Sequence, residues 1–242
     1  GKERLEILRN LSFSVERGEC VCVVGPSGCG KSTLLEMLAG FQLPDAGSVY
    51  IVNELVQNPS SNRTLVFQDY VLFPWMTVRR NIAFGLKCRG ASRTEQRQTV
   101  DALLVKFGLT GFADHYPKQI SGGMQQRVAI ARAFAVKPDV ILMDEPFSAL
   151  DEQTRFRMQI QLKEFQRQSK MTVIFVTHSV EEALYLGNRV IVLSARPAEI
   201  LRVIDVPVLA GDRQDVLNTA NFRELEREVR DLLEPSDIGV AA

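Results

Sequence analysis

Between residues 25 and 32 the chain reads Gly25-Pro26-Ser27-Gly28-Cys29-Gly30-Lys31-Ser32, which fits the pattern G-x-x-x-x-G-K-[ST] at every fixed position. The apolar run Glu19–Val24 before it has the length of a strand, and Thr33–Ala39 after it favours a helix. A phosphate-binding loop needs this order of strand, glycine-rich turn and helix, because glycines let backbone N–H groups approach phosphate oxygens closely. The segment therefore predicts an α/β fold that holds a nucleotide phosphate at the start of the helix.

Two side chains of this loop have individual chemistry. Lys31 can place its ammonium between the β- and γ-phosphates, and the Ser32 hydroxyl can ligate Mg²⁺. ATP and Mg²⁺ are therefore the expected ligands. We expect nucleotide contacts from the whole loop and the residue after it: Gly25, Pro26, Ser27, Gly28, Cys29, Gly30, Lys31, Ser32 and Thr33.

An acidic pair follows a second apolar run. Val140–Met143 reads as a buried parallel strand, so Asp144 and Glu145 emerge at its carboxyl end, where open α/β sheets bind ligands. Asp144 is expected to hold Mg²⁺ through its water shell, and Glu145 to polarise the attacking water. An ordinary solvated Asp-Glu turn is the alternative, and the upstream Lys31 and Ser32 argue against it.

A second anion site is predicted at Ile120–Arg127, where Ser121-Gly122-Gly123 opens an apolar-periodic helix. Exposed backbone N–H groups, a capping hydroxyl and the positive end of the helix dipole favour a phosphate there. One chain therefore carries two separate phosphate-binding segments.

With these motifs in this order, the chain resembles the ATP-binding subunit of an ABC transporter from about Leu8 to about Pro207. In that family the segment from Ser121 is similar to the signature loop, which contacts the γ-phosphate of ATP held by the other subunit. The family usually has glutamine where this chain has Met124, and a thioether cannot replace the hydrogen bonds of an amide.

Three further landmarks rest on the resemblance. Gln68 is similar to the Q-loop glutamine and is an expected third Mg²⁺ ligand, and Ser148–Asp151 is similar to the D-loop. His178 follows the strand-like run Thr172–Val176 and resembles the switch histidine, which senses the γ-phosphate. Taken alone, Gln68 would read as a surface residue and His178 as a structural histidine.

The resemblance implies a P-loop NTPase (RecA-like) core with an N-terminal antiparallel β part and an inserted helical subdomain. We expect residues 1–68 and 138–205 to form the core and 69–137 the helical subdomain, with a C-terminal extension at 206–242. The alternating segment Leu11–Val15 reads as a strand, and Asn221–Glu234 reads as an amphipathic helix.

The expected partners also follow from the family. A homodimer, or a paired ATPase subunit, would sandwich two ATP molecules, and a transmembrane permease would dock near residues 68–86. A periplasmic or extracellular solute-binding protein would act indirectly. Phe73 and Trp75 lie in that range, and packing in the core and contact with the permease are both open to them. The subunit would then be peripheral, on the cytoplasmic side of the inner membrane.

Composition agrees with this family. Lysine plus arginine equals aspartate plus glutamate at 29 each, so net charge gives no argument for a nucleic-acid partner. No apolar run approaches the length of about 18 residues that a membrane span needs. The four cysteines favour a reducing compartment. Cys29 is either a thiol activated by the phosphate-binding loop or a small residue that fills a tight turn.

The transported solute is harder to predict. The segments Phe67–Asp69, Leu72–Trp75, Ser121–Val128 and Arg196–Ile200 resemble bacterial importers of the nitrate, sulfonate and taurine group. An ABC-type ATPase that acts outside transport, in nucleic-acid maintenance or translation, is the alternative. The family also stacks adenine on an aromatic side chain upstream of the phosphate-binding loop. Because Phe13 is the first aromatic residue of this chain, we expect that side chain to lie in a preceding segment.

Overall fold

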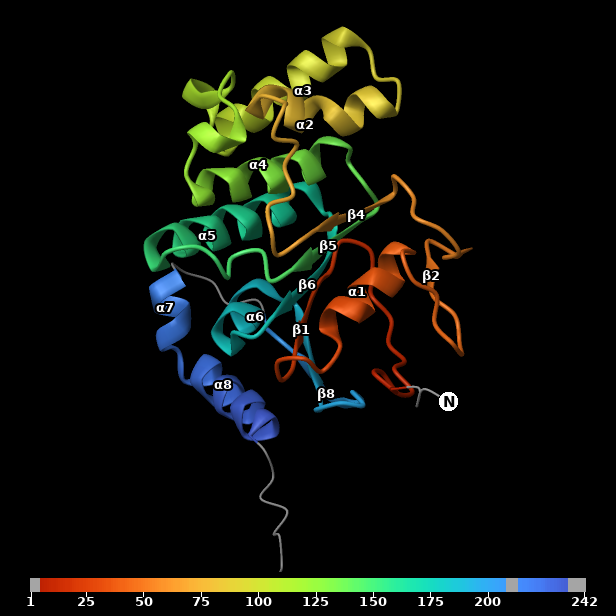
Figure 1. Cartoon of the computed structure of the whole chain (residues 1–242). Helices are drawn as coiled ribbons and strands as arrows, with labels where there is room; N and C mark the ends of the chain where they lie inside the picture. The colour runs from red at the N-terminus through yellow and green to blue at the C-terminus, as the bar shows by residue number, and fades with distance from the viewer. Residues whose placement is uncertain (1–4, 208–212, 235–242) are drawn as a thin grey trace, which may run out of the picture.

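A six-stranded sheet forms the centre of the computed structural model, which describes residues 5–207 and 213–234 (Figure 1). The strand order is β4-β5-β6-β1-β7-β8, and every neighbouring pair is parallel except β7 and β8. The strands are β1 (Cys20–Val24), β4 (Arg63–Val66), β5 (Val140–Asp144), β6 (Thr172–Thr177), β7 (Arg189–Leu193) and β8 (Ile200–Asp205). Sheet and helices together confirm the predicted α/β class.

Both faces of the sheet are buried. In β1, Val21 and Val23 point into one hydrophobic core, whereas Cys20, Cys22 and Val24 point into the other. The strands read as continuous apolar runs because successive side chains of a strand alternate between two faces that are both covered by helices.

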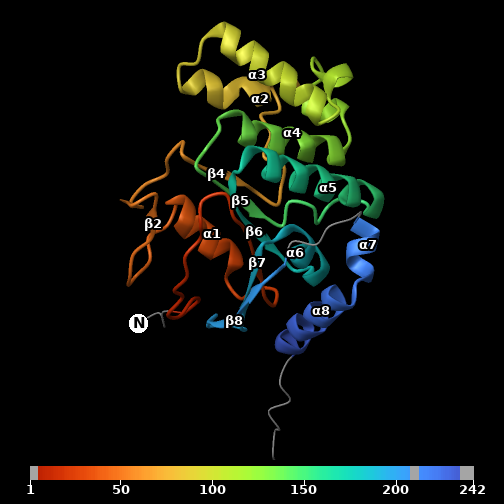
Figure 2. The same cartoon turned by 180° about the vertical axis from the view of Figure 1, so that it is seen from behind.

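Helix α1 (Lys31–Ala39) covers one face, and α5 (Glu152–Ser169) and α6 (Val180–Leu186) lie across the other (Figure 2). Leu34, Leu35 and Leu38 of α1 pack into the first core, and Met158 and Leu162 of α5 pack into the second. The sheet is therefore the middle layer of three.

Helices α2 (Val78–Cys88), α3 (Arg93–Lys106) and α4 (Gly122–Ala135) form a helical part beyond one edge of the sheet (Figure 1). Each begins after a capping hydroxyl, because the side chains of Thr77, Ser92 and Ser121 accept backbone N–H groups of the first turn. Two short 3₁₀ turns, Thr110–Phe112 and Pro117–Gln119, lead from α3 into α4.

The prediction of a strand at residues 11–15 is wrong. Residues 11–15 alternate between half-buried and exposed positions as expected, but they form no regular strand. The antiparallel β part consists instead of β2 (Tyr50–Ile51) paired with β3 (Glu54–Leu55). An alternating pattern reports which side chains face the core, but a strand also needs a neighbour for its backbone hydrogen bonds.

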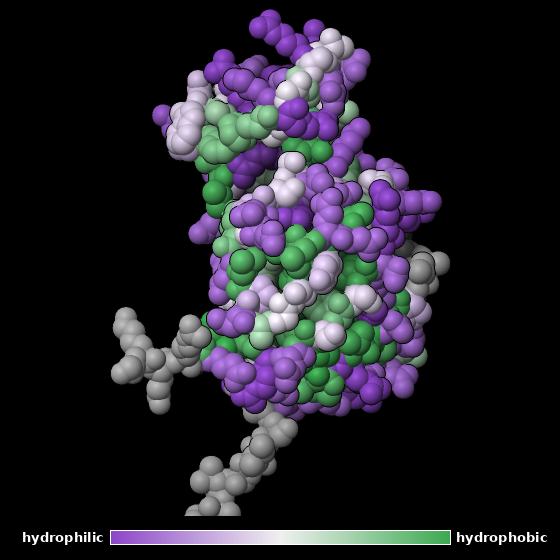
Figure 3. Space-filling model, turned by 90° about the vertical axis from the view of Figure 1, so that its right-hand side faces the viewer, coloured by the Kyte–Doolittle hydropathy of each residue, from purple (hydrophilic) through white to green (hydrophobic). Residues whose placement is uncertain are grey.

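The face that carries β2 and β3 shows hydrophobic side chains to solvent, as the hydropathy colours of Figure 3 indicate. The large exposed ones in this region are Phe41, Leu43, Tyr50, Val52 and Leu55.

The C-terminal part contains α7 (Arg213–Asn218) and α8 (Ala220–Leu233), the second of which matches the predicted amphipathic helix. Phe222 and Val229 of α8 are buried in the core that lies on the α5 and α6 side. Within the described residues, no helix has the length and apolar character that crossing a membrane requires.

Candidate functional site

The carboxyl edge of the parallel sheet gathers residues that are far apart in the sequence. The phosphate-binding loop follows β1, Glu145 follows β5, and His178 follows β6. Since β6 pairs with both β1 and β5, the three strand ends are consecutive along this edge. The order of strands, which no motif encodes, makes a single site of them.

The phosphate-binding loop has the backbone that an anion needs. Gly28 and Gly30 have φ values of 76° and 118°, in the left-handed region that favours glycine. A Cβ on Gly30 would lie 2.6 Å from Cγ2 of Ile7, whereas a Cβ on Gly28 would meet open space. Gly28 is therefore placed for close approach of a ligand, and Gly30 for tight packing.

Helix α1 begins without a capping side chain, because Gly30 occupies its N-cap. Six other helices do have one: α2, α3, α4, α5, α6 and α8. Uncapped N–H groups at a helix start, together with the helix dipole, form a ready site for phosphate. The contrast indicates that the first turn of α1 fits a nucleotide.

Lys31, near the end of this loop, is buried and only 6 % exposed. Its ammonium donates to the carbonyl oxygens of Gly25 at 2.8 Å and Pro26 at 3.0 Å. An ammonium has three N–H donors, so one remains for a phosphate oxygen.

Asp144 stands at the end of β5, facing the start of α1. Burial raises the pKa of its carboxyl, while a hydrogen bond with the Ser32 side chain and the charge of Lys31 lower it. Ser32 and Asp144 therefore lie within reach of one cation. Among the described residues there is no cluster of three or more histidine, cysteine or acidic side chains placed to hold a metal. A metal here would draw further ligands from phosphate oxygens and water.

Glu145 and His178 are in direct contact. The distance between Oε2 of Glu145 and Nδ1 of His178 is 2.8 Å. Glu145 has φ = 42°, unusual for a residue with a side chain, and its N–H donates to the Val176 carbonyl. Backbone strain of this kind is typical of functional sites. The predicted water-polarising carboxylate and the predicted switch histidine thus form one pair.

Gln68 follows β4 at the same sheet edge. The register pairs Val66 with Met143, so Gln68 lies two residues beyond the end of β4, as Glu145 lies two residues beyond Met143. Its side chain is exposed.

The signature segment, which begins at Ser121 and resembles the signature loop of the family, lines a hollow away from the phosphate-binding loop. The Ser121 hydroxyl caps α4 by accepting the Met124 N–H at 3.3 Å. Ser121, Gly122 and Gly123 line a hollow of about 290 Å³ with Asp151 and other residues: Met124, Arg127, Ala149, Leu150 and Thr154. None of these belongs to the phosphate-binding loop. Within one chain, the two predicted phosphate-binding segments therefore do not share a pocket.

Two details were not foreseen from the sequence. A Cβ on Gly122 would lie 2.7 Å from the Tyr70 hydroxyl, so this glycine permits close contact with the segment after Gln68. Arg155 of α5 donates to the carbonyl oxygens of Phe147 and Leu150, which supports the segment that resembles a D-loop. An arginine in a polar helix gives no signal in the sequence for this contact.

The cysteines fit the plainer of the two interpretations. Cys29 is 1 % exposed and packs beneath the loop against Gly25, as expected of a small residue that fills a tight turn. Cys20 and Cys22 are free and buried.

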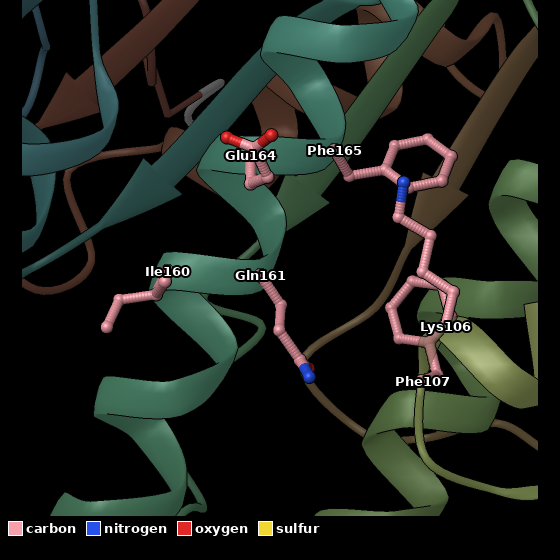
Figure 4. Close-up of a pocket in the computed structure, with 6 residues that line it drawn as sticks. All are labelled: Lys106, Phe107, Ile160, Gln161, Glu164 and Phe165. Carbon is pink, nitrogen blue, oxygen red and sulfur yellow. The ribbon is translucent and has the colours of Figure 1, made fainter.

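A further hollow, of about 220 Å³, separates the end of α3 from α5 (Figure 4). Lys106 reaches across it and places its ammonium 4.0 Å from the centre of the Phe165 ring. No predicted site residue lines this hollow.

Comparison with known proteins yields consistent matches. The family model described as "ABC transporter" matches residues 8–148. The nitrate import ATP-binding protein NrtD of Synechocystis is 47 % identical over 87 % of this chain and 79 % of its own length. The aliphatic sulfonates import ATP-binding protein SsuB of Bacillus cereus is 43 % identical, over 93 % and 87 %. The taurine import ATP-binding protein TauB of Roseobacter denitrificans is 40 % identical, over 96 % and 88 %.

Among solved structures, the dimeric ATP-binding cassette MJ0796 in a post-hydrolysis state with ADP and Pi matches with a TM-score of 0.71. It is 36 % identical, and the match covers 84 % of this chain and 94 % of that one. A second dimeric structure of the same cassette gives a TM-score of 0.76 at 34 % identity, with coverage of 86 % and 94 %.

Proposed function

The chain belongs to the ABC transporter family, and we propose that it is the ATP-hydrolysing subunit of a bacterial importer for nitrate, a sulfonate, taurine or a related small solute. The observation that carries the hydrolytic role is the contact of Glu145 with His178 beside the phosphate-binding loop. The solute class rests on the names of the relatives.

The reaction transfers the γ-phosphoryl group of ATP to water, which requires alignment and charge neutralisation more than covalent chemistry. Lys31 donates its free N–H to phosphate oxygen, together with the N–H groups that open α1. Glu145 orients the attacking water and takes up its proton. His178 holds the Glu145 carboxylate and, with Gln68, contacts the γ-phosphate.

Mg²⁺, when bound, would neutralise charge that develops on the phosphate oxygens. The Ser32 hydroxyl and the Asp144 carboxylate fit it, because in such sites Mg²⁺ binds one or two carboxylates together with substrate phosphates and keeps several waters. Gln68 is the third proposed ligand. The raised pKa of Asp144 matters here, since only the ionised carboxylate binds Mg²⁺ well.

A second subunit is proposed to complete the site. The hollow beside Ser121 lies apart from the loop that carries Lys31, and the structural neighbours are dimers. In a homodimer, or with a paired ATPase subunit, Ser121-Gly122-Gly123 of one chain would meet the γ-phosphate held by the other. Two ATP molecules would lie between the subunits, so specific activity would rise with protein concentration at low concentration.

A mixing experiment tests this arrangement. Lys31→Ala damages the phosphate-binding loop and Ser121→Ala the signature segment, so each variant alone should hydrolyse ATP slowly. Mixed dimers would join an intact Lys31 from one chain to an intact Ser121 from the other, and ATPase activity should partly return. No recovery on mixing would contradict a site shared between subunits.

Ser92→Ala is the matched control for Ser121→Ala. Ser92 also caps a helix, accepting the Glu95 N–H at 3.1 Å, and either substitution should lower stability by about 1 kcal/mol. Only Ser121→Ala should lower hydrolysis. Equal loss of activity in both would mean that the Ser121 effect is structural.

The permease is proposed to dock near residues 68–86. In this range Phe73 packs against Phe84, with ring centres 4.5 Å apart, whereas Trp75 is 68 % exposed. The packing role therefore suits Phe73 and the interface role suits Trp75. A large exposed aromatic side chain is characteristic of an interface. Docking there would place this subunit on the cytoplasmic side of the membrane, with a solute-binding protein acting from the opposite side.

A further inference from the structure

Glu182, in the first turn of α6, is a buried carboxyl outside the predicted catalytic set. It is 5 % exposed, and its two oxygens accept hydrogen bonds from the Thr177 hydroxyl and from Nε2 of Gln159, the latter at 2.8 Å. Burial raises the pKa of Glu182, and these two hydrogen bonds oppose that rise. Burial of a carboxyl in a core costs free energy, which a purely structural position would avoid with an apolar side chain.

Two residues that contact Glu182, Thr177 and Ser179, are the immediate neighbours of His178 in the sequence. Thr177 precedes His178, and its Oγ1 also accepts the backbone N–H of Ser179, which follows it, at 3.0 Å. The Ser179 hydroxyl in turn accepts the Glu182 N–H at 3.3 Å and caps α6. Ser179 and Glu182 thus form a variant of the capping box. The Glu182 carboxylate reaches the Ser179 backbone N–H through the Thr177 hydroxyl instead of directly.

The imidazole of His178 contacts Glu145 and is otherwise largely exposed. Its side chain is 60 % exposed, so packing around the ring restricts it little. The backbone on both sides of it is held instead, by one hydroxyl that donates to Glu182 and accepts from Ser179. Since the Glu145 contact is a single hydrogen bond of 2.8 Å, a small shift of this backbone would break it.

We propose that Thr177 and Glu182 are positioning residues for ATP hydrolysis: they fix the backbone on either side of His178 so that its ring meets Glu145. Gln159 completes the arrangement from α5. This inference rests on the proposed role of His178 in hydrolysis.

Thr177→Val is the direct test, because it replaces the hydroxyl by a methyl group in a buried strand and nearly preserves volume. We expect kcat to fall by about 10-fold or more, since small misplacements of catalytic groups carry costs of this order or larger. KM and the affinity for a fluorescent ATP analogue should change by less than about 2-fold, because uniform binding is untouched. Thr177→Ser keeps the hydroxyl and should restore most of kcat.

A double-mutant cycle separates positioning from general stability. If Thr177 acts through His178, then Thr177→Val should reduce kcat little further in a His178→Ala background. A merely structural role predicts additive effects, and additivity would overturn the inference. Should Thr177→Val fold poorly, Gln159→Met removes the donor from the α5 side and should show the same dependence on His178.

The possible results also separate this inference from the proposed function. Wild-type turnover in His178→Ala would refute the role of His178, and the positioning role with it. Slow turnover in His178→Ala combined with normal kcat in Thr177→Val would refute the positioning role alone.

Discussion

Substitution of Glu145 by glutamine tests the catalytic assignment most directly. The variant should fold normally, because the N–H of residue 145 still donates to the Val176 carbonyl and the side chain keeps its size. The amide can still hydrogen-bond to Nδ1 of His178, which lies 2.8 Å from the carboxylate. It cannot accept a proton from water, so orientation survives while general-base assistance is lost.

The magnitude follows from that loss. General-base assistance contributes about 10²- to 10⁴-fold to the rate. We therefore expect hydrolysis at least ~100-fold slower, which corresponds to a barrier about 2.7 kcal/mol higher. ATP affinity should hold, because Lys31 and the start of α1 are unchanged.

Single-turnover phosphate release with excess protein and saturating Mg-ATP measures the chemical step, and binding of a fluorescent ATP analogue measures affinity. Glu224→Gln, the same change at an exposed position of α8, is the control and should behave as wild type. Near wild-type turnover in Glu145→Gln would refute the assignment. Loss of ATP binding would show that the carboxylate supports the loop rather than the reaction.

Two further predictions concern pH and the interface. Since burial raises the folded-state pKa of Asp144, its neutral form stabilises the fold at low pH, and this contribution disappears as pH rises through the folded pKa. The Asp144→Asn side chain stays neutral at every pH. The free energy of unfolding of this variant minus that of wild type should therefore increase as pH rises, as measured by urea titration without nucleotide. A difference that does not change with pH would contradict this. Trp75→Ala should weaken co-purification with the permease while changing stability by less than about 0.5 kcal/mol. Val105→Ala, also at an exposed position, should do neither, and equal recovery of permease with both variants would exclude Trp75 from the interface.

Several parts of the fold could be read from short segments. The starts of α2, α3 and α4 follow Thr77, Ser92 and Ser121, because a capping hydroxyl acts on backbone groups only a few residues away. Gly108 follows the end of α3 with φ = 65°, in the left-handed region that commonly ends a helix and favours glycine. The segment from residue 11 to 15 failed as a strand, because pairing depends on a distant neighbour that alternation does not reveal.

The candidate site likewise has one part that follows from local sequence and another that depends on the tertiary structure. The loop from Gly25 to Ser32 indicates phosphate binding through local backbone geometry, so its chemistry follows from the order of residues alone. The contact of Glu145 with His178, 33 residues later, does not follow from that order. It depends on β6 lying between β5 and β1, an arrangement that only the packing of the whole sheet establishes. The burial of Glu182 in the first turn of α6 is likewise invisible in the sequence, because an acid at that place in a helix ordinarily faces solvent.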